Sequence, residues 1–463
     1  MTKTPTAPEG GRRQAKRVKP SGTDRAMASQ TSARRKSESL GSDVDLLEAM
    51  LTRENLTQAW KRVKANKGAA GIDGRSIAET WEWLKADGWA ITREQLRAGT
   101  YQPQPVRPAE IPKPNGGKRE LGILTVLDRL IQQAMLQVLM PLFDPQFSDS
   151  SYGFRPKRSA HDALRQAKKY VEEGRGWVVD IDLESFFDRV NHDKLMTRVA
   201  RGVQDSRMLR LIRSYLEAGV MRNGICVRSE DGTPQGGPLS PLLANIMLDD
   251  LDRFLEKRGH RFCRYADDCN IYVRSERAGK RVKEAMTRFL IAELSLRVNE
   301  AKSAVDRVGQ RKFLGYSFRG SNKLRIASKS IERFKTKVRE LTRRQWSINL
   351  GERLAILSRY LRGWMTYFAL TESPSVLRDL DGWIARRVRA CVWKTWKLGS
   401  TRIRKLRSFG VREDRVRMTA GCRRGSWYVA GGTVLNAALS TAWLTEQGLI
   451  RLHDRWLQLN RAH

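Results

Sequence analysis

Few of the features that mark secreted, membrane-spanning or zinc-binding proteins occur in this chain. It has no run of about 18 apolar residues, as a membrane-spanning helix needs, and no apolar N-terminal signal segment. Its five cysteines include no C-x2-C pair, and its five histidines show no ligand spacing. We therefore expect reduced thiols in a bacterial-type cytoplasm, and neither a zinc site nor a nuclease built on cysteine-bound zinc.

Acidic residues are also scarce. The 463 residues include 87 Lys plus Arg against 50 Asp plus Glu, a formal net charge of +37. This excess suits a nucleic-acid partner, because neutralising phosphates releases condensed counterions. A membrane surface is the alternative, but no single basic amphipathic segment carries the excess. The charge therefore favours nucleic acid and no membrane association, in a chain long enough for two to four domains.

The N-terminal residues 1–42 are predicted to form a disordered basic arm. The first 40 residues hold ten basic and three acidic residues and almost no bulky apolar side chain. Such a segment cannot bury a core. A solubilising tail is the alternative interpretation. Apolar residues recur at helical spacing from about Val44, where we expect ordered structure to begin.

A Tyr-Ala-Asp-Asp motif at 265–268 lies between two short apolar runs and predicts a strand–turn–strand with two carboxylates at its tip. Like charges this close disfavour their joint ionisation, and a divalent cation removes that penalty. An Asp-Asp pair alone is commonly a solvated turn. The flanking apolar runs and a second acidic strand make a metal site the stronger interpretation.

The second acidic element is the segment 177–188. In a strand of period two, Asp180 and Asp182 share one face while Val179 and Ile181 face the core. A carboxylate from a strand end and a pair from a hairpin tip suit two-metal phosphoryl transfer, with two Mg²⁺ ions roughly 4 Å apart. The spacing alone leaves the choice between Asp180 and Asp182 open.

A third element is the Pro-Gln-Gly loop at 234–236, which leads into a helix predicted to begin with Ser240 as N-cap and Pro241 as its first residue. Its glycines allow close approach to a ligand, and Gln235 supplies an amide able to touch a nucleotide. A plain loop into a helix is the alternative interpretation.

With these elements in this order, the chain resembles the reverse transcriptases encoded by group II introns, which also act as intron maturases. The resemblance runs from about residue 50 to the C-terminus. It is carried by the segments 66–74, 111–114, 118–123, 151–156, 160–164, 177–188, 234–236, 265–268, 298–302, 313–316 and 361–368.

The resemblance implies an α+β fold of the right-hand polymerase type, with fingers, a palm holding an antiparallel sheet, a helical thumb and a small basic C-terminal domain. Residues 43–326 would form fingers and palm, 327–400 the thumb or maturase domain, and 401–463 a DNA-binding region. Relatives with a nuclease continue into cysteine-rich sequence, so we expect this chain to be similar to the nuclease-less members.

The resemblance also implies roles for individual residues around the acidic site. Family members carry an aromatic residue five positions after the metal-binding Asp; Phe187 has that position relative to Asp182, which selects Asp182 over Asp180. Phe187 would crowd the sugar 2′ position and favour deoxynucleotides, or else fill a core. The implied catalytic and metal-binding set is Asp182, Asp267 and Asp268, with the carbonyl of Leu183 as a further ligand of two Mg²⁺ ions.

Basic residues complete the nucleotide site by the same resemblance. Lys113 and Arg119 would grip the incoming triphosphate and offset its developing charge, unless they make generic RNA contacts. Lys302 would lie beside the triphosphate or pyrophosphate, unless it is a solvated helix-end lysine. Glu120 replaces the proline usual in relatives and puts an acid beside Arg119. On the primer side the resemblance implies Tyr265, with Leu314 and Gly315 in a closing palm motif.

The C-terminal third combines positive charge with tryptophan. Residues 386–424 hold fourteen basic and two acidic residues, which predicts a nucleic-acid surface. Four tryptophans interleave with this charge: Trp383, Trp393, Trp396 and Trp427. Each is able to stack on a base or fill a core, and for each the core is the favoured interpretation.

The predicted function is therefore that of an RNA-directed DNA polymerase that binds its group II intron RNA, assists splicing and supports retrohoming without its own endonuclease. Its partners would be intron RNA, target DNA with a primer, and dNTPs, in a ribonucleoprotein. One alternative is a domesticated polymerase serving DNA repair or phage defence. Another is a splicing factor with an inactive polymerase fold, which the retained carboxylates and Phe187 disfavour.

Overall fold

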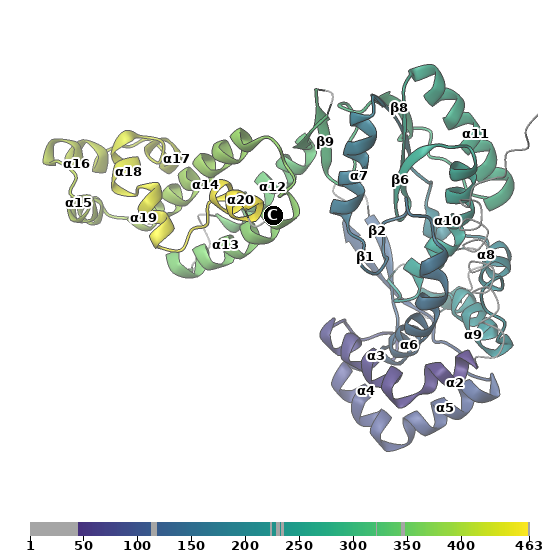
Figure 1. The fold of residues 1–463 in the computed structure, drawn as a ribbon. Helices are drawn as coiled ribbons and strands as arrows, with labels where there is room; N and C mark the ends of the chain where they lie inside the picture. Colours follow the sequence, from purple (N-terminus) through teal and green to yellow (C-terminus); the bar gives the residue numbers. More distant parts are fainter. Residues whose placement is uncertain are drawn as a thin grey trace, which may run out of the picture.

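A four-stranded antiparallel sheet organises the first two thirds of the protein (Figure 1). The computed structural model describes residues 45–112, 118–222, 225–227, 232, 236–320, 322–343 and 348–461, so the predicted N-terminal arm lies outside the described residues. The strand order is β6-β7-β3-β8, and every neighbouring pair is antiparallel. Its strands are β3 (Trp177–Ile181), β6 (Arg261–Tyr265), β7 (Asp268–Val273) and β8 (Ala304–Arg307).

Helices cover the two faces of this sheet. On one face α7 (Ala160–Glu172) packs against β6 and β7; on the other α11 (Glu276–Leu294) packs against β3, β7 and β8 (Figure 1). Val178 and Val179 accordingly belong to two different hydrophobic cores, as the alternation of side chains along a strand requires. Helix α10 (Ser240–Lys257) buries Leu243, Ile246, Met247 and Leu251 in the same core as Val179.

The α10 start differs from its sequence prediction. The N-cap is Leu239 rather than Ser240, so Ser240 is the first helical residue and Pro241 the second. Leu239 is 1% exposed, and its N–H donates to the side-chain oxygen of Gln132 at 3.4 Å. Burial of Leu239 in the core therefore begins the helix one residue earlier than the capping preference of serine predicts.

The N-terminal part is a layer of helices packed on a long buried helix, α6 (Val126–Phe143). Two antiparallel hairpins, three short helical turns and two further helices complete this part of the chain and the connections of the sheet. The elements are α2 (Leu46–Leu51), α3 (Arg53–Ala65), α4 (Ile77–Trp83), η2 (Leu84–Gly88), α5 (Trp89–Ala98), β1 (Arg107–Pro112), β2 (Lys118–Ile123), η3 (Asp144–Gln146), η4 (Phe186–Asp188), α8 (His192–Val199), α9 (Ser206–Glu217), β4 (Val220–Arg222) and β5 (Ile225–Val227).

The last third is helical and follows a short hairpin. The hairpin strands are β9 (Tyr316–Arg319) and β10 (Lys323–Ile326). The helices are α12 (Ser328–Leu341), α13 (Leu350–Tyr367), α14 (Pro374–Thr395), α15 (Gly399–Ser408), α16 (Glu413–Ala420), α17 (Ser426–Val429), α18 (Thr433–Ala438), α19 (Thr441–Glu446) and α20 (Leu452–Arg461). The antiparallel sheet and the helical C-terminal region predicted from the sequence are confirmed, whereas the domain boundaries stay predictions.

One hydrophobic core joins the sheet to this helical region. It contains Val178 and Tyr272 from the sheet, Phe313 before β9, Tyr316 at the start of β9, and buried leucines such as Leu357 of α13. Farther along, Asp381 of α14 accepts hydrogen bonds from the first N–H groups of α20, at 2.7 Å from Leu452. Among the described helices, none is both long and apolar enough to cross a membrane.

Candidate active site

Sheet register brings the acidic residues to one end of neighbouring strands. Asp180 pairs with Asn270 and Ile181 with Cys269, so Asp182, which directly follows β3, lies beside the start of β7 at Asp268. Tyr265 pairs with Asp268 and closes the β6–β7 hairpin around Ala266 and Asp267. The predicted hairpin tip and the predicted strand end are therefore neighbours, although 84 residues separate Asp182 from Ala266 in the chain.

The carboxylates at this end of the sheet interact electrostatically. Asp268 reaches solvent, yet the protein surrounds it closely enough that burial, followed by the charges of Asp267, Asp180 and Asp182, raises its pKa to about 6. Burial also raises the pKa of Asp180, against the opposing effect of Arg311, which donates two hydrogen bonds to one Asp180 oxygen at 3.0 and 2.7 Å. The site thus concentrates negative charge inside a strongly basic protein.

Backbone contacts fix Asp182. Its N–H donates to the hydroxyl of Ser303 at 2.9 Å, and its carbonyl accepts from the N–H of Asn299 at 2.8 Å. The Lys302 ammonium lies 3.3 Å from the Asp182 carboxylate, and its side chain is 64% exposed. Residues 299–303 therefore hold the backbone of Asp182 and place an exposed cation beside its carboxylate, while the nucleotide-binding role of Lys302 stays a prediction.

The donor set suits a hard divalent cation. Carboxylates are the ligands that Mg²⁺ prefers, and the mutual repulsion that raises the pKa of Asp268 is the penalty that a cation relieves. Within the described ranges, no three His, Cys, Asp or Glu side chains already form a metal-binding group. Coordination of Mg²⁺ by Asp182, Asp267, Asp268 and the Leu183 carbonyl therefore stays a prediction.

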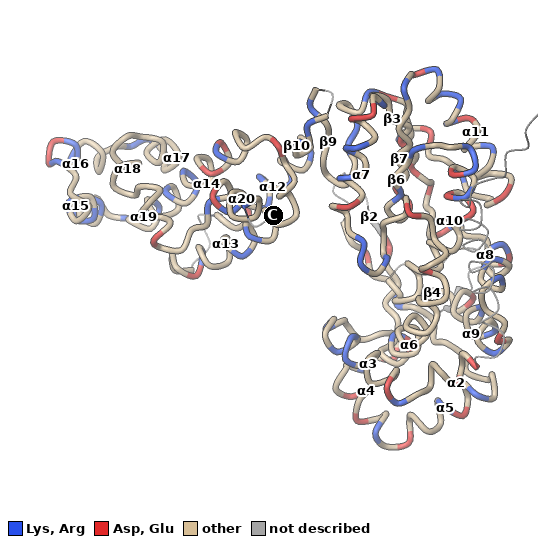
Figure 2. The backbone as a smooth tube through the Cα atoms, in the orientation of Figure 1, with Lys and Arg blue, Asp and Glu red and all other residues tan. Residues whose placement is uncertain are grey.

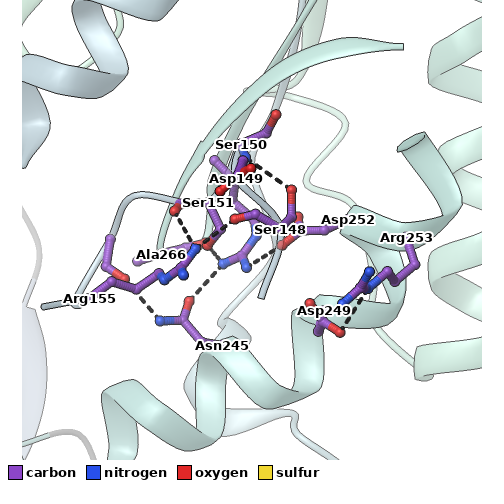
Figure 3. A network of polar contacts seen from close by, with 12 residues as sticks. Ser148, Asp149, Ser150, Ser151, Arg155, Asn245, Asp249, Asp252, Arg253 and Ala266 are labelled. Carbon is purple, nitrogen blue, oxygen red and sulfur yellow. Dashed lines mark hydrogen bonds and ion pairs between the residues drawn. The ribbon is translucent and has the colours of Figure 1, made fainter. Parts of the chain in front are cut away.

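A buried ion pair contacts the turn of the β6–β7 hairpin; Figure 3 labels Asp252 of this pair and Ala266 of the turn. Arg264 and Asp252 of α10 both have side chains 0% exposed, and Arg264 donates to the two Asp252 oxygens at 2.8 and 2.5 Å. Arg264 also donates to the Ala266 carbonyl at 3.0 Å and to Asn245 at 2.9 Å. This network holds the turn at Ala266, whose φ of +58° lies in the left-handed region that few non-glycine residues adopt.

Gly153 supports the same turn from the other side. Asn245 donates to its carbonyl at 2.9 Å. A Cβ at position 153 would lie 2.3 Å from the nitrogen of Ala266, so only glycine permits this approach. The sequence segment 151–156, quoted for its resemblance to the family, therefore has a physical role in seating the hairpin.

The two adjacent phenylalanines after Asp182 differ in burial. Phe186 is 3% exposed, whereas Phe187 is half-buried and meets the Phe186 ring edge-on at 5.1 Å between centroids. Ser185, with φ of +46°, begins the short 3₁₀ turn that presents them. Phe186 is thus fully in the core, whereas Phe187 packs against the same core and stays partly accessible, so its predicted contact with the sugar stays a prediction.

The predicted primer-side residues also come together. Leu314 and Gly315 form a tight turn with φ of +49° and +80°, closed by mutual backbone hydrogen bonds of 2.9 Å between Phe313 and Tyr316. Tyr265 and Leu314 are both partly buried against the core that continues into the C-terminal helices. Tyr367 lies near both, because its hydroxyl donates to the Leu314 carbonyl at 2.9 Å, and Tyr265 adds to the effect of burial in raising the pKa of Tyr367.

For three residues predicted to contact the nucleotide, the structure describes no side chain. Lys113 and Gln235 lie outside the described residues. Arg119 is described by its backbone, which pairs with Ile111 in the β1–β2 hairpin. Their roles stay predictions.

Several residues at the site were missed by sequence reasoning. They are Arg264, Asp252, Asn245, Arg311, Lys312 and Tyr367. Lys312 is exposed and close enough to Asp268 and Asp180 to oppose the rise in the pKa of both. A usable signal was the position of Arg264 inside an apolar strand, where a buried cation requires a buried anion.

Comparisons with known proteins agree with this geometry. Residues 111–318 match the family model described as "Reverse transcriptase (RNA-dependent DNA polymerase)", and residues 331–410 match "Group II intron, maturase-specific domain". The first match covers both acidic elements, Lys302 and the Leu314–Gly315 turn. The protein therefore carries a reverse transcriptase domain, a class of enzyme that generally uses divalent metal ions.

Comparison with individual relatives identifies the family within this class of enzyme. The chain is 34% identical to protein YkfC of Escherichia coli over 324 residues, which are 61% of this chain and 84% of YkfC. It is 40% identical over 200 residues to the group II intron-encoded protein LtrA of Lactococcus lactis subsp. cremoris, covering 42% of this chain but only 33% of LtrA. The chain belongs to the group II intron reverse transcriptase/maturase family.

Among solved structures, a chain of a Cas6-RT-Cas1–Cas2 complex is similar, with 25% identity and a TM-score of 0.36. That match covers 54% of this chain and 43% of the other.

Proposed function

We propose that the protein is an RNA-directed DNA polymerase whose nucleotidyl-transfer site consists of Asp182, Asp267 and Asp268. The observation that carries the proposal is the β3–β7 register, which puts Asp182 beside the Asp267–Asp268 tip. Burial, followed by the charges of the neighbouring carboxylates, raises the pKa of Asp268 there. Two Mg²⁺ ions bound there, with help from the Leu183 carbonyl, would lower the pKa of the primer 3′-hydroxyl and stabilise the pyrophosphate oxygens.

The chain's own side chains bind and orient the nucleotide in this proposal. Lys302 neutralises Asp182 before the nucleotide arrives, and its exposed, flexible side chain is free to turn to the triphosphate or pyrophosphate. Lys113 and Arg119 of the β1–β2 hairpin grip the triphosphate, with Gln235 contacting the nucleotide from its loop. Phe187 crowds the sugar 2′ position, so that deoxynucleotides are preferred.

The primer would end against Tyr265 and the Leu314–Gly315 turn. Both border the core that continues into α12 and α13, so the helical region that we assign as thumb and the sheet that we assign as palm share the primer terminus. This placement supports the proposed right-hand division into fingers, palm and thumb.

The second half of the proposal concerns intron RNA. The maturase-specific match at 331–410 supports binding of a group II intron RNA and assistance of its splicing. We further propose target-DNA binding by residues 401–463 and retrohoming as a ribonucleoprotein. We also propose that the primer comes from an existing nick or a replication-fork strand.

Primer extension on an RNA template tests the polymerase half directly. Wild-type protein should extend a DNA primer only with Mg²⁺ and dNTPs, and the Asp267→Ala, Asp268→Ala double variant should lose this activity while still supporting splicing. Full extension by the double variant would remove these residues from the mechanism.

Copurified RNA tests the intron half. A defined structured RNA that the protein also copies supports the intron role. Efficient copying without capture of such an RNA would favour the domesticated alternative.

A further inference from the structure

Two neighbouring aromatic side chains are exposed on the short helix α17, beyond both matched family models. Trp427 is 37% exposed and Tyr428 is 54% exposed. The residues that follow anchor the helix, because Val429 is 4% and Ala430 0% exposed. Trp393 and Trp396, by contrast, are 2% and 7% exposed and fill the core as predicted. Trp427 is therefore the clearest exception to the core interpretation of the C-terminal tryptophans.

An arginine stacks on each exposed ring. The guanidinium carbon of Arg386 lies 4.2 Å from the centre of the Trp427 ring, and that of Arg424 lies 4.4 Å from the Tyr428 ring. Arg386 also donates to the Trp427 carbonyl at 3.2 and 3.0 Å, which fixes the helix to α14. A Cβ at Gly431 would lie 2.7 Å from the Arg386 guanidinium, so a larger residue there would displace this side chain.

The surrounding charge is strongly positive. The segment 386–424 carries fourteen basic and two acidic residues, and none of residues 425–445 is acidic. Lys and Arg mark α15 and α16 in Figure 2, and both helices lie with α17 at the end of the C-terminal region away from the sheet. A negatively charged strand is therefore drawn to the same end of the molecule that exposes the two rings.

We propose that Trp427 and Tyr428 form a stacking platform for unpaired bases of single-stranded DNA, with Arg386 and Arg424 as adjoining cations. Bases in a duplex already stack on one another and show only their edges, so exposed rings suit an unpaired strand. The choice of DNA rests on the proposed function, in which the C-terminal region holds the target or primer strand while the maturase domain engages RNA.

Salt-dependent binding of a labelled oligo-dT strand to the full chain separates stacking from charge. Tyr428→Ala and Trp427→Ala should each weaken binding about fivefold or more at every salt concentration. They should leave the slope of log Kd against log salt unchanged, because the rings carry no charge. Arg424→Ala should reduce that slope by about one, as loss of one phosphate contact does.

Two control variants test whether binding depends on the aromatic rings themselves. Tyr428→Phe keeps the ring and should bind as wild type does. Met418→Ala removes an apolar side chain that is 70% exposed on neighbouring α16 and should also leave binding unchanged. Thermal melting of every variant shows whether it folds, and crosslinking of iododeoxyuridine DNA to wild-type protein should map to Trp427 or Tyr428 without any substitution.

Unchanged oligo-dT affinity in a folded Trp427→Ala, Tyr428→Ala double variant would overturn the platform, as would crosslinks confined to other residues. Tighter binding of the matching RNA, lost in the same variants, would overturn the assignment to DNA. Primer extension by wild-type protein is scored separately: its absence would defeat the proposed polymerase function, while the oligonucleotide series would still decide the platform.

Discussion

The hydroxyl of Tyr367, at the end of α13, donates a 2.9 Å hydrogen bond to the carbonyl of Leu314. The Tyr367 carbonyl in turn accepts a 2.7 Å hydrogen bond from the hydroxyl of Tyr316. Gly315 is held as well, because its carbonyl accepts from the N–H of Ala327 and the hydroxyl of Ser330, both at 3.0 Å. The beginning of α12 and the end of α13 therefore hold the turn that we assign to the primer.

Tyr367→Phe should weaken primer binding while leaving the ring packing intact. Leu314 holds a left-handed conformation that costs about 1–2 kcal/mol, and loss of a hydrogen bond worth about 1 kcal/mol removes part of its support. We expect about a fivefold higher Kd for primer–template and shorter products per binding event. Single-turnover incorporation at saturating primer should change less.

Tyr360→Phe is the matched control for this experiment. Tyr360 lies on the same helix and packs against Phe334 at 5.8 Å between ring centroids. It should leave the primer Kd unchanged, and equal effects of the two substitutions would refute the specific coupling of Tyr367 to Leu314.

Asp252→Asn should destabilise the protein and the catalytic hairpin together. It leaves Arg264 charged and buried without its anion, a loss of about 3–5 kcal/mol in unfolding free energy. Urea unfolding of the variant and of the wild type measures this loss of unfolding free energy.

Arg253→Ala on the same helix is the control. It breaks an ion pair to Asp249 in which the arginine is 46% exposed, and it should lower the unfolding free energy by at most about 1 kcal/mol. Similar losses in both variants would contradict a structural role for the buried pair.

Much of this site was predictable from the sequence, and the exceptions have physical reasons. The period-two pattern around Asp182 and the apolar runs beside Asp267 predict strands because one face of each must be buried. Arg264 lies inside an apolar strand, which indicates a buried cation, but the anion that pairs with it was not predictable from the sequence. Its partner, Asp252, comes from a helix, and only tertiary packing brings the two together.

The start of α10 and the role of Tyr367 show the same limit. Serine followed by proline predicts a cap by local preference, yet burial of Leu239 decided the outcome. Tyr367 belongs to a segment quoted for its family resemblance, but its contact with Leu314 spans 53 residues. Local sequence patterns predict elements, whereas such contacts depend on how the elements pack.

Phe187→Ala should relax discrimination against ribonucleotides. Removal of the half-buried ring opens space near the sugar, so the ratio of kcat/KM for dNTP over rNTP should fall at least about tenfold, a change of about 1.4 kcal/mol in discrimination. Steady-state primer extension with matched dCTP and CTP measures the ratio.

Phe186, whose ring lies beside that of Phe187, serves as the control for this experiment. Phe186→Leu alters a residue that is 3% exposed and should lower the unfolding free energy by about 1–2 kcal/mol without changing sugar selectivity. A selectivity loss confined to Phe186→Leu would reassign the gate.

Lys302→Ala should raise the KM for dNTPs about tenfold with a smaller effect on primer binding. The exposed ammonium beside Asp182 is the described cation best placed to meet the phosphates. Lys283→Ala removes a lysine paired with Glu300 at 2.6 Å on α11 and serves as the control for general loss of charge. An unchanged KM for Lys302→Ala, measured by single-nucleotide extension, would leave Lys302 as a structural partner of Asp182.

The central claim is that Asp182, and not Asp180, completes the site with Asp267 and Asp268. Asp180→Asn and Asp182→Asn remove one charge each from neighbouring alternate positions of the same segment. Asp180 is already engaged by Arg311, whereas Asp182 lies at the strand end beside the hairpin tip. Rates of Mg²⁺-dependent extension on an RNA template should fall by a factor of about 10³ or more for Asp182→Asn, and by less than about tenfold for Asp180→Asn. Wild-type rates for Asp182→Asn, or equal loss in both variants, would contradict the account.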